Sequence, residues 1–237
     1  MPQYFPPNAN AFAKWLIWGG LVFTALLVTS LTVYARTSNN RVKVPVEQPV
    51  AFSHQLHNGQ MGIDCRYCHT SVEVAASANV PPTEICMTCH SQIRVGSPQL
   101  EAVYASWGRV DTDNDGVGDT LRLPNQPGAG APIAWNRVHD LADFVYYNHS
   151  AHINKGIGCS YCHGRVNQMV GVWKNEPMTM GWCLECHRNP AQYVRPREEV
   201  FNMDYEYPEN QDELGPALVE AYHINTEKLP QCSTCHR

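Results

Sequence analysis

The sequence predicts a mainly α-helical chain with extensive loops, little or no β-sheet and one N-terminal transmembrane helix. Three observations lead to this fold class: an uncharged run of twenty residues near the N-terminus, five short cysteine motifs spread over the rest of the chain, and long connections rich in Pro and Gly. Charged residues make up only 16% of the 237 residues, against a usual share of about 25%. We therefore expect irregular backbone with short helices around the cysteine motifs.

The N-terminal run is the first predicted element. Residues 15–34 are WLIWGGLVFTALLVTSLTVY, which as a helix at about 1.5 Å per residue spans a hydrocarbon core of about 30 Å. A cleaved signal peptide is the alternative, because Val33–Ala35 resembles a small-x-small cleavage site. The apolar region of a signal peptide, however, is normally only about 7 to 15 residues long. We therefore expect residues 1–35 to be an anchor and residues 36–237 to form one domain outside the membrane.

The cysteine motifs follow one pattern, Cys-x-x-Cys-His, which occurs five times and uses all ten cysteines. Two thiols three positions apart can add to the two vinyl groups of one haem, and the histidine that follows falls beneath the iron. A zinc knuckle and a thioredoxin-like redox pair also contain Cys-x-x-Cys, but neither needs a histidine after every second cysteine. The motifs therefore predict five c-type haems, which would supply much of the core. The attachment residues would be Cys65, Cys68, Cys86, Cys89, Cys159, Cys162, Cys183, Cys186, Cys232 and Cys235, and the proximal iron ligands His69, His90, His163, His187 and His236.

The first four motifs form two repeats. His54-x-x-His57 is followed by seven residues, a motif, sixteen residues and a second motif. His149-x-x-His152 is followed by six residues, a motif, nineteen residues and another motif. A segment rich in Pro and Gly, residues 91–138, separates the repeats, and a further short helix is expected over Pro216 to His223.

Six histidines outside the motifs are candidates for the distal positions of five irons. If most irons carry a second protein ligand, substrates do not readily reach them, and the chain carries electrons without being a catalyst by itself. Methionine is the other common axial ligand, and Met180 precedes the fourth motif by three residues. The alternative for each side chain is an ordinary core or surface role, which applies most to His223. The predicted distal ligands are His54, His57, His139, His149, His152 and Met180.

An acidic loop between the repeats has part of a calcium-loop pattern. Asp111, Asp113, Asp115 and Asp119 occupy its positions one, three, five and nine, but position twelve is Arg122 where an EF-hand has glutamate. A solvated acidic turn is the alternative, because Asp, Asn and Gly favour turns on backbone grounds alone. Both interpretations, a structural calcium site and a plain turn, are kept for this loop.

The charge balance argues against one class of function. Lys and Arg number 17 and Asp and Glu 22, which gives a formal charge of -5, and each haem would add two propionates. A basic nucleic-acid-binding surface is therefore not expected.

Several phrases resemble one protein family. FSHQLH, CRYCH, RVHDLADFVYYNHSAH, MTMGWCLECHRNP and the final CSTCHR, behind a single anchor helix, are similar to the pentahaem cytochrome c subunit of bacterial alternative complex III. The likeness covers nearly the whole chain, and the acidic loop DTDNDGVGD looks like an insertion. It implies a membrane complex that oxidises menaquinol or ubiquinol and passes electrons to a periplasmic cytochrome c, a copper protein or an oxidase. It also implies integral-membrane quinol-oxidising subunits, an iron-sulfur subunit and a separate monohaem cytochrome c as partners.

Haem attachment also predicts the location. Because c-type haems are attached on the outer side of bacterial energy-transducing membranes, we expect a single-pass protein of the cytoplasmic (inner) membrane with residues 36–237 on the periplasmic side. The distribution of positive charge favours the opposite orientation, since Lys14 precedes the span whereas Arg36, Arg41 and Lys43 follow it.

Two other functions are weighed against a subunit of a quinol oxidoreductase. A pentahaem reductase of nitrite or another small oxyanion needs one open iron and often replaces a motif histidine by lysine, but all five motifs here end in His. A stand-alone membrane-anchored quinol dehydrogenase cytochrome would need a quinone pocket, which a single anchor helix forms poorly.

The motif count gives a first testable prediction. A pyridine haemochrome assay on the purified protein should return five haems c per chain, all retained after acid-acetone extraction, because each motif supplies two thioether bonds. A count of three or fewer would contradict the haem assignment.

Overall fold

The computed structural model describes residues 6–39, 41–110, 120–121 and 130–236. Contacts between residues divide the chain into two units, residues 1–41 and residues 42–237. Each unit is described by itself.

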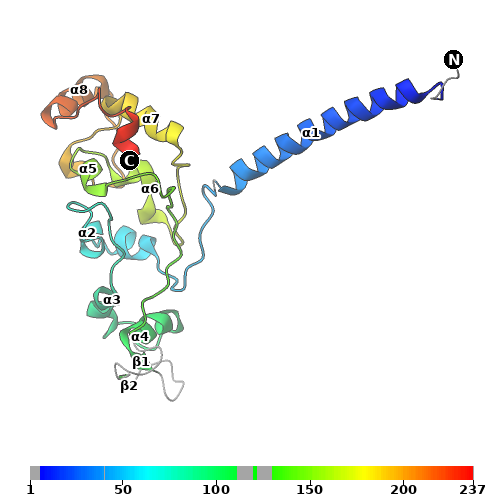
Figure 1. Ribbon diagram of the computed structural model, residues 1–237. Coiled ribbons are helices and arrows are strands. Elements are labelled where there is room, and N and C mark those ends of the chain that lie inside the picture. The colour runs from blue at the N-terminus through cyan, green and yellow to red at the C-terminus, as the bar shows by residue number, and fades with distance from the viewer. Residues whose placement is uncertain (1–5, 40, 111–119, 122–129, 237) are drawn as a thin grey trace. The chain divides into compact units, whose positions relative to one another are not determined.

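The first unit is a single helix, α1, at Ala9–Asn39 (Figure 1). It extends beyond residues 15–34 at both ends, and an 18-residue window within Ala9–Ala35 has a mean hydropathy of 2.0. This helix is long and apolar enough to cross a membrane, although a signal sequence can have the same length and composition. Three threonine hydroxyls donate to the backbone carbonyl four residues earlier at 2.7–2.8 Å, so their polar groups are satisfied within the helix.

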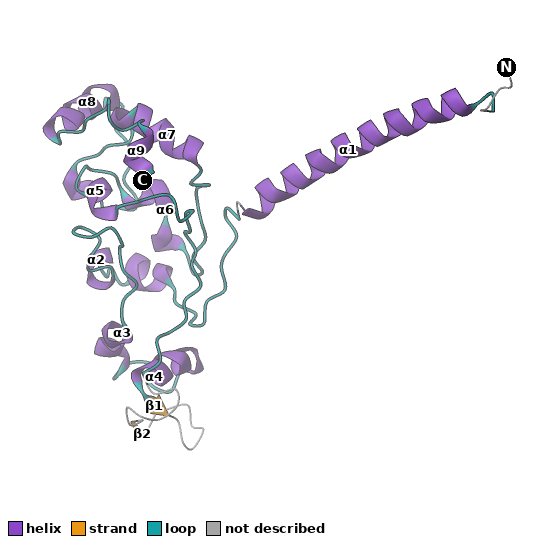
Figure 2. Ribbon diagram, in the orientation of Figure 1, coloured by secondary structure: helices purple, strands orange, loops and turns teal. Residues whose placement is uncertain are grey.

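The second unit consists of short helices joined by loops, as Figure 2 shows in purple and teal. Its described α-helices are α2 Cys65–Cys68, α3 Thr83–His90, α4 Glu101–Trp107, α5 His149–Ile153, α6 Cys159–His163, α7 Met180–Arg188, α8 Gln211–Ala221 and α9 Cys232–Cys235. A π-helix, η1 Gln55–Gln60, and 3-10 turns at Pro98–Leu100 (η2), Val166–Gln168 (η3), Pro190–Gln192 (η4) and Arg197–Glu199 (η5) complete the helical elements. Strands β1 Arg109–Val110 and β2 Thr120–Leu121 pair antiparallel. The predicted fold class, mainly α with almost no sheet, is confirmed.

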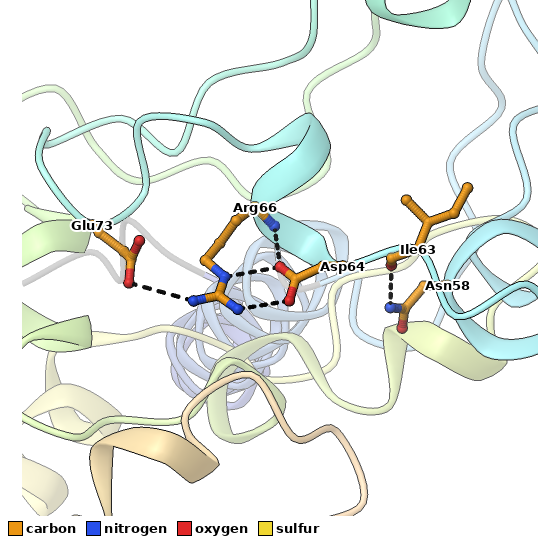
Figure 3. Close-up of polar contacts among 5 residues, drawn as sticks. All are labelled: Asn58, Ile63, Asp64, Arg66 and Glu73. Carbon is orange, nitrogen blue, oxygen red and sulfur yellow. Dashed lines mark hydrogen bonds and ion pairs between the residues drawn. The ribbon is translucent and has the colours of Figure 1, made fainter. Parts of the chain in front are cut away.

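Local polar contacts fix where a motif helix begins. At the start of α2, the Asp64 carboxylate accepts the Arg66 backbone N–H at 2.8 Å and pairs with the Arg66 guanidinium at 2.7 Å (Figure 3). Asn58 donates to the Ile63 carbonyl at 2.7 Å and so ties the preceding loop to η1. The Arg66 guanidinium, through hydrogen bonds to Asp64, holds the pKa of that carboxyl below its usual value. An acidic N-cap of this kind satisfies the free N–H groups of the first turn.

Two small apolar clusters form the core of the described residues, and each lies against a motif helix. One contains Met87 of α3 and packs against Cys86 of the second motif; its other members are Val50, Leu100, Val103 and Tyr104. The other consists of Val72, Ile153 and Val200 and packs against Cys159 of the third motif. Apolar burial is thus concentrated beside the cysteine motifs.

A buried arginine fixes the long connection between the fourth and fifth motifs. Arg195 is only 1% exposed, and its guanidinium donates to Ser160 Oγ and to the Asn202 carbonyl at 3.3 Å. The same guanidinium lies over the ring of Tyr205 at 4.5 Å. It occupies the space where Gly158 lacks a side chain, so the connection is held against the start of α6.

Helix α8 covers part of the helix predicted at residues 216–223 but begins five residues earlier, at Gln211. A Cβ at Gly215 would collide with the carbonyl oxygen of Ala191 in η4. Gln211 Nε2 donates to that same carbonyl at 2.7 Å. The missing side chain at Gly215 therefore allows α8 to pack directly on the backbone of η4.

This packing predicts that Gly215→Ala lowers the free energy of unfolding by about 1–3 kcal/mol, the usual cost of overpacking. Gly181→Ala in α7 is the matched control, because a Cβ there meets only Thr179 Oγ1 at 4.0 Å. Alanine at Gly181 should be neutral or stabilising by up to about 1 kcal/mol, the helix-propensity gain. Denaturant unfolding of the detergent-solubilised protein measures both changes, and equal stabilities of the two variants would contradict the close contact.

Candidate haem sites

The two cysteines of each motif lie on one short helix. The five motifs fall on α2, α3, α6, α7 and α9, and none of the ten cysteines forms a disulfide. Residues three apart on a helix share a face, so each motif presents its two thiols on the same side. This arrangement suits attachment of one planar group per helix.

The motif histidines share one hydrogen-bonding pattern. In four of them Nδ1 donates to a backbone carbonyl, and since a carbonyl can only accept, Nε2 is left with its lone pair. The acceptors are Asn79 O for His69 at 2.7 Å, Ile93 O for His90 at 3.2 Å, Leu229 O for His187 at 3.1 Å and Phe144 O for His236 at 3.2 Å. A neutral imidazole fixed in this tautomer is a ready metal ligand.

The histidines of the two His-x-x-His pairs are fixed in the same way. His57 Nδ1 lies 2.9 Å from the Ser53 carbonyl, and His152 Nδ1 lies 2.7 Å from the Asn148 carbonyl, four residues earlier in each case. His149 Nδ1 donates to the Ala76 carbonyl at 2.8 Å and thereby links the two repeats. His54 differs, because its Nδ1 is buried without a hydrogen-bond partner.

An aromatic residue two positions before each pair contacts both histidines. Phe52 meets His54 edge-on, with ring centroids 4.8 Å apart and planes at 87°, and stacks on His57 at 4.5 Å and 24°. Tyr147 repeats this geometry, at 4.8 Å and 90° with His149 and at 4.4 Å and 28° with His152. Phe52 and Tyr147 are positioning residues that the sequence analysis missed. Their signal was their equal offset in FSHQLH and YNHSAH.

Three of the four histidines in the His-x-x-His pairs have their ring near the ring of a motif histidine. The distance is nearly the same in each case. The centroid separations are 6.1 Å for His57 and His90, 6.4 Å for His149 and His163, and 6.2 Å for His152 and His187. Two of the three pairs are nearly parallel, at 10° and 24°, so an edge-to-face aromatic contact does not explain the spacing.

One iron fits between two such rings. A metal–imidazole bond is about 2 Å long, so two nitrogens on opposite sides of one metal lie about 4 Å apart, and their ring centroids about 6 Å apart. The observed separations of 6.1–6.4 Å match this value. The residues present therefore fit a haem iron with a histidine on each side.

Comparison with known proteins agrees with this donor set. Residues 145–237 match the family model described as cytochrome c7 and related cytochrome c, and residues 31–113 match that of the class III cytochrome C family. The chain is a multihaem cytochrome c. It is 26% identical over 164 residues to the "Menaquinone reductase, multiheme cytochrome c subunit" of Nitratidesulfovibrio vulgaris (strain Hildenborough), an alignment that covers 60% of this chain and 69% of that protein.

Thiols of neighbouring motifs show how the motifs of the cytochrome are arranged. At each of four junctions, burial and then charge repulsion from a cysteine of the adjacent motif raise the pKa of one thiol. The pairs are Cys68 with Cys86, Cys159 with Cys65, Cys162 with Cys186, and Cys183 with Cys235. Direct contacts give the same neighbours: Tyr67 with Thr88 for the first and second motifs, Val72 with Ile153 beside Cys159 for the first and third, Tyr161 with Trp182 for the third and fourth, and His187 with Leu229 for the fourth and fifth. The motifs therefore follow one another in space in the order second, first, third, fourth and fifth. The same order is visible along α3, α2, α6 and α7 in Figure 1.

Tyrosines inside the motifs make two of these junctions. Tyr67, within the first motif, hydrogen bonds through its hydroxyl to Thr88 Oγ1 of the second at 3.0 Å. Tyr161, within the third, stacks on Trp182 beside the fourth at 5.3 Å and 17°. The tyrosine before the second cysteine thus joins the two motifs of each repeat.

Burial keeps the histidine imidazoles and the cysteine thiols of the cytochrome uncharged. It is the main cause that lowers the pKa of His54 and of His139 to about 4 and that of His163 to about 3. Before the thioether bonds form, burial also raises the pKa of the Cys162 and Cys186 thiols to about 12. Neutral imidazoles keep the lone pair that ligation requires.

His139, Met180 and the less favoured candidate His223 are not members of these ring pairs. His139 contacts His163 from the side of its Nδ1, with Nε2 of His139 at 3.3 Å. His223 is the one exposed histidine of the eleven and lines a cavity of about 450 Å³ beside Arg188 and Glu220. Met180 is the first residue of α7 and is 63% exposed. No described histidine ring faces His236 at the iron-spanning distance; its described ring neighbour is Phe144, at 5.7 Å.

The predicted calcium loop cannot be compared with these sites. Asp111, Asp113, Asp115 and Asp119 lie outside the described residues, between β1 and β2. Within the described part of the chain, no cluster of three or more His, Cys, Asp or Glu side chains could hold a further metal ion.

Proposed function

We propose that the chain is a membrane-anchored pentahaem cytochrome c that carries electrons within a quinone-linked oxidoreductase. The observation that carries this proposal is the facing of three histidine pairs at 6.1–6.4 Å, each pair joining a motif histidine to one member of a His-x-x-His turn. All five motifs contain the attachment cysteines and the proximal histidine. Each haem, when bound, supplies a one-electron Fe(III)/Fe(II) couple.

The repeat supports one rule for the axial ligands. The first histidine of a turn faces the first motif of its repeat, and the second histidine faces the second motif, as in His149 with His163 and His152 with His187. By this rule His57 serves the motif of His90, and His54 serves that of His69. Charge repulsion from His69 is the second cause of the lowered pKa of His54, after burial, which supports the fourth pair.

The fifth motif requires a different ligand. Motifs four and five are adjacent, since His187 Nδ1 donates to the carbonyl of Leu229, three residues before Cys232, and Met180 lies one helical turn before Cys183. We infer that Met180 is the distal ligand of the iron at His236. A methionine ligand raises the reduction potential of a c-type haem.

The chain's own residues thus perform three tasks. The cysteines would attach the haems, the paired histidines would bind the irons, and the rings of Phe52 and Tyr147 hold the orientation of the imidazoles that they stack on, those of His57 and His152. Irons closed on both sides do not readily bind small oxyanions, which favours an electron carrier over a reductase. The chain is therefore proposed as a non-catalytic subunit.

The partners follow from the resemblance to alternative complex III and from the relative's name. The resemblance implies a membrane complex that oxidises quinol, whereas the relative is named a multiheme cytochrome c subunit of a menaquinone reductase. We propose integral-membrane quinol-oxidising subunits, an iron-sulfur subunit and a monohaem cytochrome c as partners, with the haem domain on the periplasmic side of the membrane. The row of motifs ends at the second and the fifth, which contain the two exposed cysteines, Cys89 and Cys232. These two ends are the expected docking points for redox partners.

Removing a distal histidine tests the ligand rule. His152→Ala should leave one iron without its sixth ligand, so that one haem becomes high-spin and binds carbon monoxide, because His152 faces the fourth motif. His223→Ala is the matched control and should leave all haems low-spin, since His223 is exposed and faces no motif histidine at the iron-spanning distance among the described residues. An unchanged spectrum for His152→Ala, or a high-spin haem for His223→Ala, would refute the rule.

Purification from native membranes in mild detergent tests the complex. Polytopic and iron-sulfur subunits should co-purify with the cytochrome, and a menaquinol analogue should reduce its haems in the complex but not in the isolated chain. A solitary chain that turns over nitrite would support the reductase instead. A solitary chain that a quinol analogue reduces directly would support the stand-alone dehydrogenase.

A further inference from the structure

His163 differs from the other four motif histidines in its hydrogen-bond partner. Its Nδ1 lies 3.3 Å from Nε2 of His139, whereas the other four donate to backbone carbonyls. The two rings are 4.3 Å apart and cross at 77°, so the contact is edge-to-face and in the direction of a hydrogen bond. A side chain has taken the place that a carbonyl occupies at the other motifs.

The two nitrogens of His163 have different roles. Because Nδ1 of His163 is engaged by His139, Nε2 is the nitrogen left to bind an iron between His163 and His149, whose ring centroids lie 6.4 Å apart. Nδ1 of His163 therefore carries the proton, and His139 Nε2 accepts it. Accepting this bond uses the nitrogen through which His139 would otherwise bind a metal.

The surroundings of His139 support an acceptor role. It lies in a loop between Arg137 and Asp140, which pair with each other at 2.8 Å and leave the imidazole without a carboxylate partner in the described structure. His139 is half-buried, as are His163 and His149.

We propose that His139 is a positioning residue for His163: it orients the proximal imidazole of the third motif, tunes the reduction potential of that haem, and does not ligate an iron itself. This inference rests on the proposed function. A hydrogen bond at Nδ1 makes a ligating imidazole more electron-donating and fixes its ring orientation. Electron donation to the iron stabilises the ferric state, so the His139 contact lowers the potential of one haem.

Two variants separate this role from ligation. His139→Leu removes both the hydrogen-bond acceptor and the imidazole, whereas His139→Gln keeps an acceptor oxygen but loses the imidazole. Each variant is characterised by its haem count, its carbon monoxide difference spectrum and a potentiometric titration. His152→Ala serves as the positive control for a lost axial ligand.

The expected result is that both variants keep the wild-type haem count and bind no additional carbon monoxide. In His139→Leu, one haem should become easier to reduce by about tenfold in its equilibrium constant, which is about 59 mV for one electron. His139→Gln should stay closer to the wild-type potential, because its amide oxygen can accept the Nδ1–H.

Two outcomes would overturn the proposal. A new high-spin, carbon-monoxide-binding haem in either variant, as in the positive control, would make His139 an axial ligand. Unchanged potentials in both variants would make its role merely structural. If His139→Leu does not accumulate, the carbon monoxide spectrum of His139→Gln still decides between positioning and ligation. Failure of the proposed function itself is distinguishable, because the wild-type chain would then lack its full set of haems.

Discussion

The structure depends on one constraint: a single helical turn with two histidines supplies one ring to each of two different motifs. His149 and His152 lie on α5, yet they face His163 on α6 and His187 on α7. Because the two histidines are only three residues apart, the two motifs must lie beside each other. The tyrosine contacts between motif helices, Tyr67 with Thr88 and Tyr161 with Trp182, are the direct consequence of this closeness.

The same constraint explains how two repeats form one row. The first histidine of the second turn, His149, donates to the Ala76 carbonyl of the first repeat, and the Ser150 N–H donates to the Ala75 carbonyl at 3.1 Å. These bonds place the third motif next to the first, where Val72 packs with Ile153 beside Cys159. The second motif is therefore left at one end and the fifth at the other. Arg195 then fixes the connection to the fifth motif against α6 with a buried guanidinium.

Much of this arrangement could be predicted from the sequence, because the chemistry is local. The five residues of Cys-x-x-Cys-His are enough to predict a haem attachment site. The spacing of the His-x-x-His pairs from the motifs indicates the duplication. The spatial order of the motifs could not be predicted, since it depends on bonds such as His149 to Ala76, which join residues far apart in the chain. His139 was expected to be a distal ligand on the basis of residue type alone. Its contact with His163 Nδ1 follows from the path of a loop that has no periodic pattern.

The ligand set of each iron is the most direct test of this account. A high-resolution cryo-electron microscopy map of the haem-loaded protein from native membranes would show both axial ligands of every iron. The account predicts an iron between His57 and His90, between His149 and His163, and between His152 and His187, with the two histidines of each turn on different irons. A map in which both histidines of one turn bind the same iron, or in which neither faces a motif histidine, would contradict it.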